Sequence, residues 1–146
     1  MNHITKTFDE LTLRELYRIL KLRNEVFIVE QHCPYQDCDD LDQVSLHLQM
    51  TDKDHLLAYA RIVPPGTAYP DPSIGRVITR MNARGKGLGK RIMELAIDRC
   101  RSEFPGMPIR IMAQCYLSKF YKGLGFVDQG EEFLEDGLPH IEMVLT

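Results

Sequence analysis

One segment constrains the fold of this chain more than any other, because it places a strand, a glycine turn and a long helix in direct succession. Residues 73–80 have the apolar character of a strand, and three glycines alternate after it, at positions 85, 87 and 89. Apolar residues then recur at helical spacing to about residue 103, where two prolines and a glycine end the pattern. Residues 109–113 form a further apolar stretch. The order predicts two parallel strands joined by a right-handed helical crossover.

The flanking segments extend this unit into a mixed sheet. Thr12 and Glu15 have the spacing of a capping box and begin a helix. Apolar patterns predict three strands upstream, at residues 4–8, 44–50 and 56–63. Downstream we expect a short helix and two strands, at residues 117–123, 126–133 and 140–145. The predicted fold class is therefore α/β, a single domain over residues 1–146 with a mixed β-sheet flanked by helices.

Length and charge exclude several classes of protein. A chain of 146 residues suits one domain and can bury a core of ordinary size. The net charge of -3 gives no excess of cations for phosphates, so we expect no nucleic-acid partner. No stretch approaches the roughly 18 apolar residues of a membrane span, and the first residues lack a signal-peptide pattern. Four cysteines without a C-x-x-C pair predict reduced thiols, a cytoplasmic location and no metal.

The glycine turn predicts an anion site at the start of the long helix. Glycines let the backbone approach a ligand closely, and free N–H groups at a helix start point at an anion. Arg84, Lys86, Lys90 and Arg91 surround the turn, and the combination fits a pyrophosphate. A P-loop would need glycine at position 84, and a dinucleotide fingerprint would need one at position 90 or 92; both patterns are absent. Taken alone, the turn is equally consistent with a basic, exposed helix start.

Two motifs resemble the GNAT acetyltransferase family. Arg84, Gly87 and Gly89 match the family's R/Q-x-x-G-x-G/A signature, and residues 120–126 are similar to its F/L-Y-x-x-x-G-F segment. Residues 22–37 together with residues 137–140 are similar to the small bacterial ElaA-like branch. The resemblance covers most of the chain and implies a GNAT-like sheet whose central β-α-β unit binds coenzyme A.

The resemblance also implies a role for individual residues. Acetyl-CoA is the implied cosubstrate, with its pantetheine arm and thioester on the backbone of the strand end Val77, Ile78 and Thr79. The implied pyrophosphate site is formed by Arg84, Gly85, Lys86, Gly87, Leu88, Gly89 and Lys90. Gln114 stands where many members carry Asn and would contact the pantetheine arm. Tyr121 takes the place of the general acid that protonates the departing thiolate; the alternative is a core aromatic on the short helix.

The general base is open among three residues. An alkylammonium must lose a proton before it attacks the thioester, and the candidates are Glu30, His47 and His140, directly or through water. His47 is expected on the polar face of its strand, and His140 begins the last strand. Each histidine alone is better explained as an ordinary surface residue, and the reaction can also proceed without a single base.

An acidic loop at residues 37–42 invites two further interpretations. A calcium site of the EF-hand type would need an oxygen ligand at position 41 and a Glu at position 48, and both positions hold Leu. A solvated loop is the plain interpretation. The sharper hypothesis is that Asp37, Asp39, Asp40 or Asp42 attracts a cationic amine substrate.

The motifs together predict an N-acetyltransferase that moves the acetyl group of acetyl-CoA to a small-molecule or peptide amine, by direct attack within a ternary complex. The alternatives are a protein N-terminal or lysine acetyltransferase and a non-catalytic module that binds acyl-CoA. The sequence identifies neither the amine nor the oligomeric state, and a homodimer stays open because dimers are the commonest closed assembly.

Overall fold

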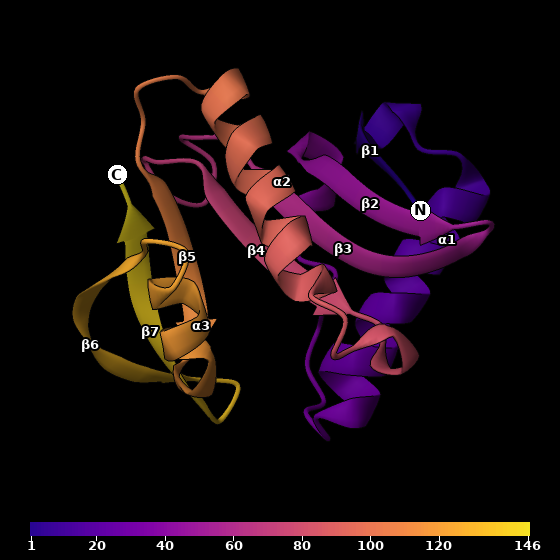
Figure 1. The fold of residues 1–146 in the computed structure, drawn as a ribbon. Coiled ribbons are helices and arrows are strands. Elements are labelled where there is room, and N and C mark those ends of the chain that lie inside the picture. Colours follow the sequence, from indigo (N-terminus) through magenta and orange to yellow (C-terminus); the bar gives the residue numbers. More distant parts are fainter.

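Seven strands form one mixed sheet in the computed structural model, which describes residues 1–146 (Figure 1). The strands are β1 (Asn2–Thr7), β2 (Leu46–Asp52), β3 (His55–Val63), β4 (Ser73–Thr79), β5 (Ile109–Gln114), β6 (Val127–Glu135) and β7 (Leu138–Leu145). Their order across the sheet is β1-β2-β3-β4-β5-β7-β6, and β4 with β5 is the one parallel pair. The predicted α/β fold class is confirmed, including the parallel pair around the glycine turn.

Three α-helices and one π-helical turn accompany the sheet. They are α1 (Leu13–Arg23), the π-helical turn Asn24–Glu30, α2 (Leu88–Glu103) and α3 (Ser118–Lys122). None of the helices is long and apolar enough to cross a membrane. The capping box predicted at α1 is present, because the Glu15 N–H donates to Thr12 Oγ1 over 3.1 Å and the Thr12 N–H donates to Glu15 Oε1 over 2.9 Å. This cap fixes where α1 begins.

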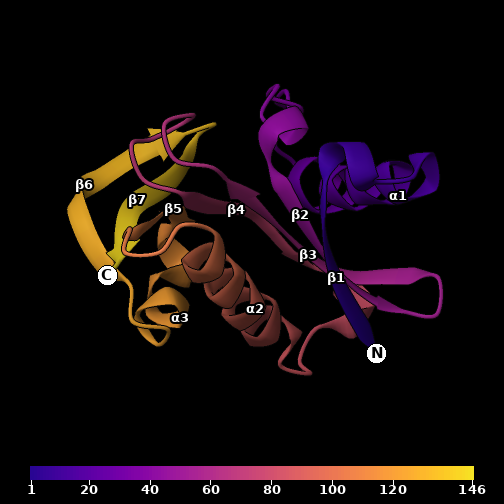
Figure 2. The same ribbon diagram turned by 90° about the horizontal axis from the view of Figure 1, so that it is seen from above.

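Helices cover both faces of the sheet (Figure 2). α2 packs on one face, where Ala60 and Ile62 of β3 join Ile92 and Met93 of the helix in the main hydrophobic cluster. α1 covers part of the other face with a much smaller cluster. That cluster contains Ile19, Leu22, Leu56, Tyr59 and Ile78. The alternation along β3, with Ala60 on one side and Tyr59 on the other, therefore serves two interiors rather than one interior and solvent.

β2 is buried on both faces, which corrects a prediction. Alternating apolar and polar residues predicted a half-buried strand that begins near residue 44. The strand begins at Leu46, after a 3₁₀ turn that contains Val44, and its polar residues His47 and Gln49 are 1% and 0% exposed. Both lie on the α1 side, where Arg18 donates to Gln49 Oε1 over 2.9 Å. The polar half of the pattern marks a charged interior instead of a solvated face.

β4 and β5 separate along their length. Their ladder pairs Ser73 with Arg110, at the beginning of both strands, and goes no further. Beyond that point β4 stays paired with β3 as far as Thr79, and β5 stays paired with β7 as far as Gln114. Figure 1 shows the two ribbons diverging away from this pair. The backbone at the end of β4 therefore has no strand partner on the β5 side.

A bulge bends β4 in the middle of this separation. Arg76 and Val77 together stand opposite the single residue Ala60, because Gly75 pairs with Arg61 and the next pair is Ile78 with Tyr59. Arg76 has a positive φ of 51°, a left-handed conformation that side chains other than glycine rarely adopt. Bulges bend a strand and increase its twist. The bulge thus turns the end of β4 away from β5.

Candidate functional site

A cavity of about 1120 Å³ fills the space where β4 and β5 diverge. Its walls come from β4, the glycine turn, the end of β5, α3 and the start of β7, together with the π-helical turn, the segment from Gln31 to Leu41 and two residues of β3. The predicted cofactor residues in this wall are Val77, Ile78, Thr79, Arg84, Gly85, Gly87, Leu88, Gly89, Gln114 and Tyr121. Lys86 and Lys90 are exposed and lie outside the wall. The structure thus brings the two motifs of the sequence to one cavity.

The glycine turn supplies unpaired backbone N–H groups at the start of α2. Gly85 and Gly87 have left-handed φ values of 81° and 77°, and Gly87 is the N-cap of the helix. A Cβ at either position would meet no atom within 4 Å, so glycine is required here by backbone conformation rather than by space. The first helical hydrogen bond runs from the Arg91 N–H to the Gly87 carbonyl over 3.1 Å, and the N–H groups before it have no helical partner. The turn can therefore bind an anion.

Arg84 is paired with Glu30, one of the three candidate bases, which lines the cavity. The guanidinium forms two hydrogen bonds to the Glu30 carboxylate, one of them 2.8 Å from Nη2 to Oε2, and its Nε donates to the Thr79 carbonyl over 3.0 Å. The hydrogen bond from Arg84 lowers the pKa of Glu30. A carboxylate with a lowered pKa and both oxygens engaged is a poor proton acceptor. Glu30 instead ties the π-helical turn to the glycine turn.

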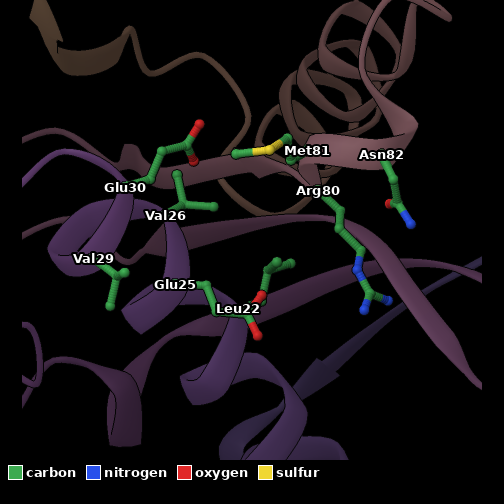
Figure 3. Close-up of a pocket in the computed structure, with 8 residues that line it drawn as sticks. All are labelled: Leu22, Glu25, Val26, Val29, Glu30, Arg80, Met81 and Asn82. Carbon is green, nitrogen blue, oxygen red and sulfur yellow. The ribbon is translucent and has the colours of Figure 1, made fainter.

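A second hollow of about 550 Å³ shares Val26 and Glu30 with the cavity (Figure 3). It is lined by Leu22, Glu25, Val26, Val29, Glu30, Arg80, Met81 and Asn82. Figure 3 shows the Glu30 carboxylate directed away from Val29, and Val29 and Met81 are both largely exposed. No residue of the glycine turn or of α3 reaches this hollow. The larger cavity is therefore the candidate site.

Tyr121 is a buried phenol that lines the cavity. Its ring packs edge-on against Phe120 and Phe126, with centroids 5.1 and 6.0 Å away, and 7% of the residue is exposed. No side-chain hydrogen bond engages its hydroxyl, and burial raises the pKa of Tyr121 to about 12. The core packing and the cavity-lining position are both present, so the two interpretations of this residue are compatible. The phenol is protonated at neutral pH and can donate a proton to a basic leaving group.

Gln114 ends β5 at the cavity wall. Its Nε2 donates to Gln31 Oε1 over 3.3 Å, and Gln31 follows the π-helical turn. The pair joins two walls of the cavity, from β5 and from the segment after α1. The Gln114 carbonyl oxygen keeps its acceptor capacity, so the predicted contact with a pantetheine amide stays chemically available.

His47 does not reach the cavity, which corrects its prediction as an exposed candidate base. Its ring is 1% exposed on the α1 face of β2. One ring nitrogen lies 2.6 Å from the Tyr59 hydroxyl and the other lies 2.8 Å from the Asp42 carbonyl. Burial lowers the pKa of His47. With both nitrogens engaged inside the protein, His47 has no position from which to accept a substrate proton.

His140 is the histidine that lines the cavity. It is 9% exposed on β7, and Phe133 stacks on its ring with centroids 6.0 Å apart. Its Nδ1 lies 2.8 Å from the Leu138 carbonyl, which can only accept, so we assign the proton of the neutral ring to Nδ1. Nε2 then carries the lone pair, 3.9 Å from the nearest Glu135 oxygen. Of the three predicted bases, His140 alone combines a free acceptor nitrogen with a place in the cavity.

The acidic loop is paired with arginines, and the hypothesis that it attracts an amine stays a prediction. Asp37 accepts hydrogen bonds from Arg23 over 2.8 Å and from Arg76 over 2.9 Å. Asp39 accepts two hydrogen bonds of 2.8 Å from Arg61. These carboxylates are paired with arginines; Asp39 lines the cavity, whereas Asp40, which is exposed, does not. No group of three or more His, Cys, Asp and Glu side chains is arranged to hold a metal ion.

Sequence reasoning missed the three arginines that pair with this loop. Arg23 is fully buried and bonds Asp42 over 2.7 Å as well as Asp37, while Arg61 lies 3.0 Å from Asp42. A signal was present, because Arg61 interrupts an apolar strand, where a charge is rarely found without a partner. The partners lie 14 to 39 residues away along the chain, too far for a local pattern to connect them.

The comparisons with known proteins agree with the fold and the motifs. Residues 12–146 match the family model described as "Acetyltransferase (GNAT) domain". The chain belongs to the GNAT acetyltransferase family. Protein ElaA of Escherichia coli is 40% identical to this GNAT chain over 137 residues, which cover 92% of the chain and 90% of ElaA. The predicted resemblance to the ElaA-like branch is confirmed.

Solved structures of acyltransferases have the same fold as this GNAT chain. The crystal structure of an acyl-CoA N-acyltransferase from Pseudomonas aeruginosa has a TM-score of 0.95 and 41% identity, with 99% of each chain covered. An aminoglycoside 6'-N-acetyltransferase complexed with coenzyme A shares the fold at a TM-score of 0.73 and 15% identity, covering 97% of this chain and 95% of the other. A single GNAT acyltransferase fold therefore accounts for the whole sheet and its helices.

Proposed function

We propose that this chain transfers the acetyl group of acetyl-CoA to a small-molecule or peptide amine by direct attack. The observation that carries the proposal is the continuous cavity that joins the anion-binding glycine turn to the Tyr121 phenol. Unpaired N–H groups at Gly87 and the following residues suit a pyrophosphate, and the unpartnered backbone of Val77 to Thr79 suits an extended amide-containing arm. The structural neighbour solved with coenzyme A supports this choice of ligand.

The chemistry assigns one step to each polar group of the cavity. The neutral amine attacks the thioester carbonyl carbon, so that a C–N bond forms and the C–S bond breaks. The attacking nitrogen then loses its extra proton to water. Tyr121 donates its proton to the departing sulfur, because a phenol with a pKa raised to about 12 is still protonated at neutral pH. Solvent returns a proton to the Tyr121 phenolate once the thiol has formed. His140 Nε2 takes the proton that the substrate ammonium loses, directly or through water, while Leu138 holds the other ring nitrogen.

Binding of the cosubstrate is tested with Gly87→Glu. The substitution puts a carboxylate at the anion site, and we expect it to abolish the binding of CoA measured by calorimetry. Gly106→Glu is the matched control, because Gly106 has nearly the same φ of 78° and equally open space but lies after α2, outside the cavity. Equal affinity in both variants would place the pyrophosphate elsewhere.

The acid role is tested with Tyr121→Phe. We expect kcat to fall by about 100-fold or more while the affinity for acetyl-CoA changes little, because the phenyl ring keeps the packing against Phe120 and Phe126. Tyr17→Phe on the exposed side of α1 is the control. A kcat equal to that of the parent protein would leave Tyr121 with a packing role alone.

Two other functions are separated by a thiol-release assay with a panel of amines, peptides and intact proteins. Release of CoA with lysine or N-terminal peptides but with no small amine would favour a protein acetyltransferase. Tight binding of acetyl-CoA without release for any acceptor would favour a module that binds acyl-CoA without turnover. The protonated Tyr121 in the cavity wall favours the transferase.

A further inference from the structure

The bulge in β4 lies where β4 turns away from β5 and the cavity opens. It requires a left-handed backbone conformation at a residue that is not glycine. Arg76 has a φ of 51°, and β-strands normally place glycine or asparagine where such a value is needed. A left-handed non-glycine residue persists only where its surroundings hold it. The contacts of the Arg76 side chain therefore show what keeps the bulge in place.

The side chain of Arg76 is clamped by the acidic loop. Its Nε donates to Asp37 Oδ1 over 2.9 Å, and its Nη2 donates to the Asp37 carbonyl over 2.9 Å and to Asp39 Oδ2 over 3.3 Å. Three hydrogen bonds to two aspartates fix both the position and the orientation of the planar guanidinium. The conformation of the bulge is thereby coupled to a loop about 37 residues earlier in the chain.

The clamp is anchored in the interior by two further arginines. The second oxygen of Asp37 accepts from Arg23 Nε over 2.8 Å, and Asp39 is held by both Nη groups of Arg61. Arg23 and Arg61 are 0% and 3% exposed, and both also bond Asp42. Three arginines and three aspartates thus form one lattice of ion pairs that is balanced in charge. Its members are Arg23, Arg61, Arg76, Asp37, Asp39 and Asp42. Its buried half cannot move without breaking several bonds, so the loop is a fixed support for Arg76.

The clamp on Arg76 affects the position of the strand end that follows the bulge. Val77, Ile78 and Thr79 follow Arg76 directly and line the cavity with backbone that β5 does not pair. Arg84 contacts this strand end through the Thr79 carbonyl, but its two hydrogen bonds to Glu30 anchor it and the glycine turn to the π-helical turn, outside β4. A loosened bulge would therefore change the wall beside the pantetheine arm more than the anion site.

We propose that Arg76, gripped by Asp37 and Asp39, is a positioning residue that keeps the end of β4 in register with the pantetheine arm and thioester. This inference rests on the proposed function, because it presumes that the cavity takes acetyl-CoA. In this proposal the acidic loop holds the strand end that binds the cofactor.

Arg76→Gly tests the clamp separately from the backbone strain. Glycine adopts the left-handed conformation freely, so the variant permits the bulge but removes the grip. We expect the affinity for CoA, measured by calorimetry, to fall about tenfold to hundredfold, because small misplacements of a binding wall cost that much. The affinity for adenosine 3′,5′-bisphosphate, which carries the nucleotide end without the pantetheine arm, stays unchanged. Arg76→Lys, with a point charge in place of the planar fork, gives a smaller loss.

The controls are measured with the same two ligands, CoA and adenosine 3′,5′-bisphosphate. Asp37→Asn should reproduce the selective loss, and Arg99→Gln, which breaks an exposed pair with Glu103 on α2, should change neither affinity. Full CoA affinity in Arg76→Gly would overturn the clamp, and so would equal losses for both ligands, since these would reflect general damage to the fold. If the unsubstituted protein binds adenosine bisphosphate but gains nothing from the pantetheine arm, the clamp fails alone. If it binds neither ligand, the proposed function fails as well.

Discussion

The two faces of the sheet are held by different chemistry, although both are buried. Beneath α2, apolar side chains such as Ile62, Ile92 and Met93 form one continuous cluster. Beneath α1, five apolar residues share the interior with Arg23, Arg61 and their aspartates. Hydrocarbon packing is non-directional and tolerates small changes, whereas hydrogen-bonded ions fix specific partners. The α2 face therefore supplies cohesion, and the α1 face specifies the loop and the bulge that shape the cavity.

The largest expected effect comes from breaking the charged face at Arg23. In Arg23→Gln, the carboxylates of Asp37 and Asp42 each lose a buried cationic partner. Removing one member of a buried ion pair costs about 3–5 kcal/mol, because the other charge is left uncompensated. We expect a loss of that size in the free energy of unfolding, measured with urea. Arg99→Gln, at an exposed pair, should cost about 0–1 kcal/mol. Similar losses in the two variants would mean that burial adds nothing to the lattice.

Acid should weaken the charged face before the apolar one. Burial alone would raise the pKa of Asp39, but the hydrogen bond and charge of Arg61 outweigh it and lower the pKa to about 2. The unfolded value is about 3.9, so this carboxylate stabilises the fold above about pH 4 and loses that contribution as the pH falls toward 2. The urea midpoint should therefore drop between about pH 5 and pH 2, and drop less in Asp39→Asn, which cannot titrate.

Asp54→Asn on the exposed β2–β3 turn is the control for this acid effect. It should keep the full drop in midpoint of the parent protein. An undiminished drop in Asp39→Asn would show that other carboxylates carry the acid sensitivity and that the pairing with Arg61 contributes little.

The apolar face should respond in smaller steps. Ile92 is 0% exposed in the cluster between α2 and the sheet, and Ile92→Val removes one methyl group without adding a polar atom. We expect a loss of about 0.5–1.5 kcal/mol in the free energy of unfolding, and no change in its dependence on pH. A loss as large as that in Arg23→Gln would remove the contrast between the two faces.

The same contrast explains what the sequence could and could not predict. The strand, glycine turn, α2 and β5 follow from local patterns, because capping, helical spacing and glycine conformation act within a few residues. Tyr121 and the glycine turn reach one cavity as the two motifs imply. Apolar alternation also identified the α2 face of the sheet. These features need no knowledge of distant partners.

Errors arose wherever a polar residue has a distant partner. His47 was read as solvent-facing because the cover of its strand, α1, lies far from β2 in the chain. Glu30 stands among three candidate bases in the sequence, where its pairing with Arg84, 54 residues away, cannot be inferred from a local pattern. The aspartates of the loop were read as solvated for the same reason. A period of two along a strand reports that two faces differ, and it does not report whether the second face meets water or buried charge.

The smallest predicted effect concerns His47, the one histidine that the charged face encloses. Burial lowers its pKa, the charges of Arg23 and Arg61 act in the same direction, and Asp42 opposes them. The unfolded value is about 6.5, so the neutral ring contributes fully above that pH, and the contribution declines as the pH falls toward the lower folded value. The free energy of unfolding should therefore fall between about pH 7.5 and pH 5.5, and His47→Asn should flatten this slope whatever it does to the absolute stability. His55→Asn, at the exposed first residue of β3, should leave the slope as it is. A slope that survives in His47→Asn would mean that other titrating groups carry this pH dependence and that burial of the His47 ring contributes little to it.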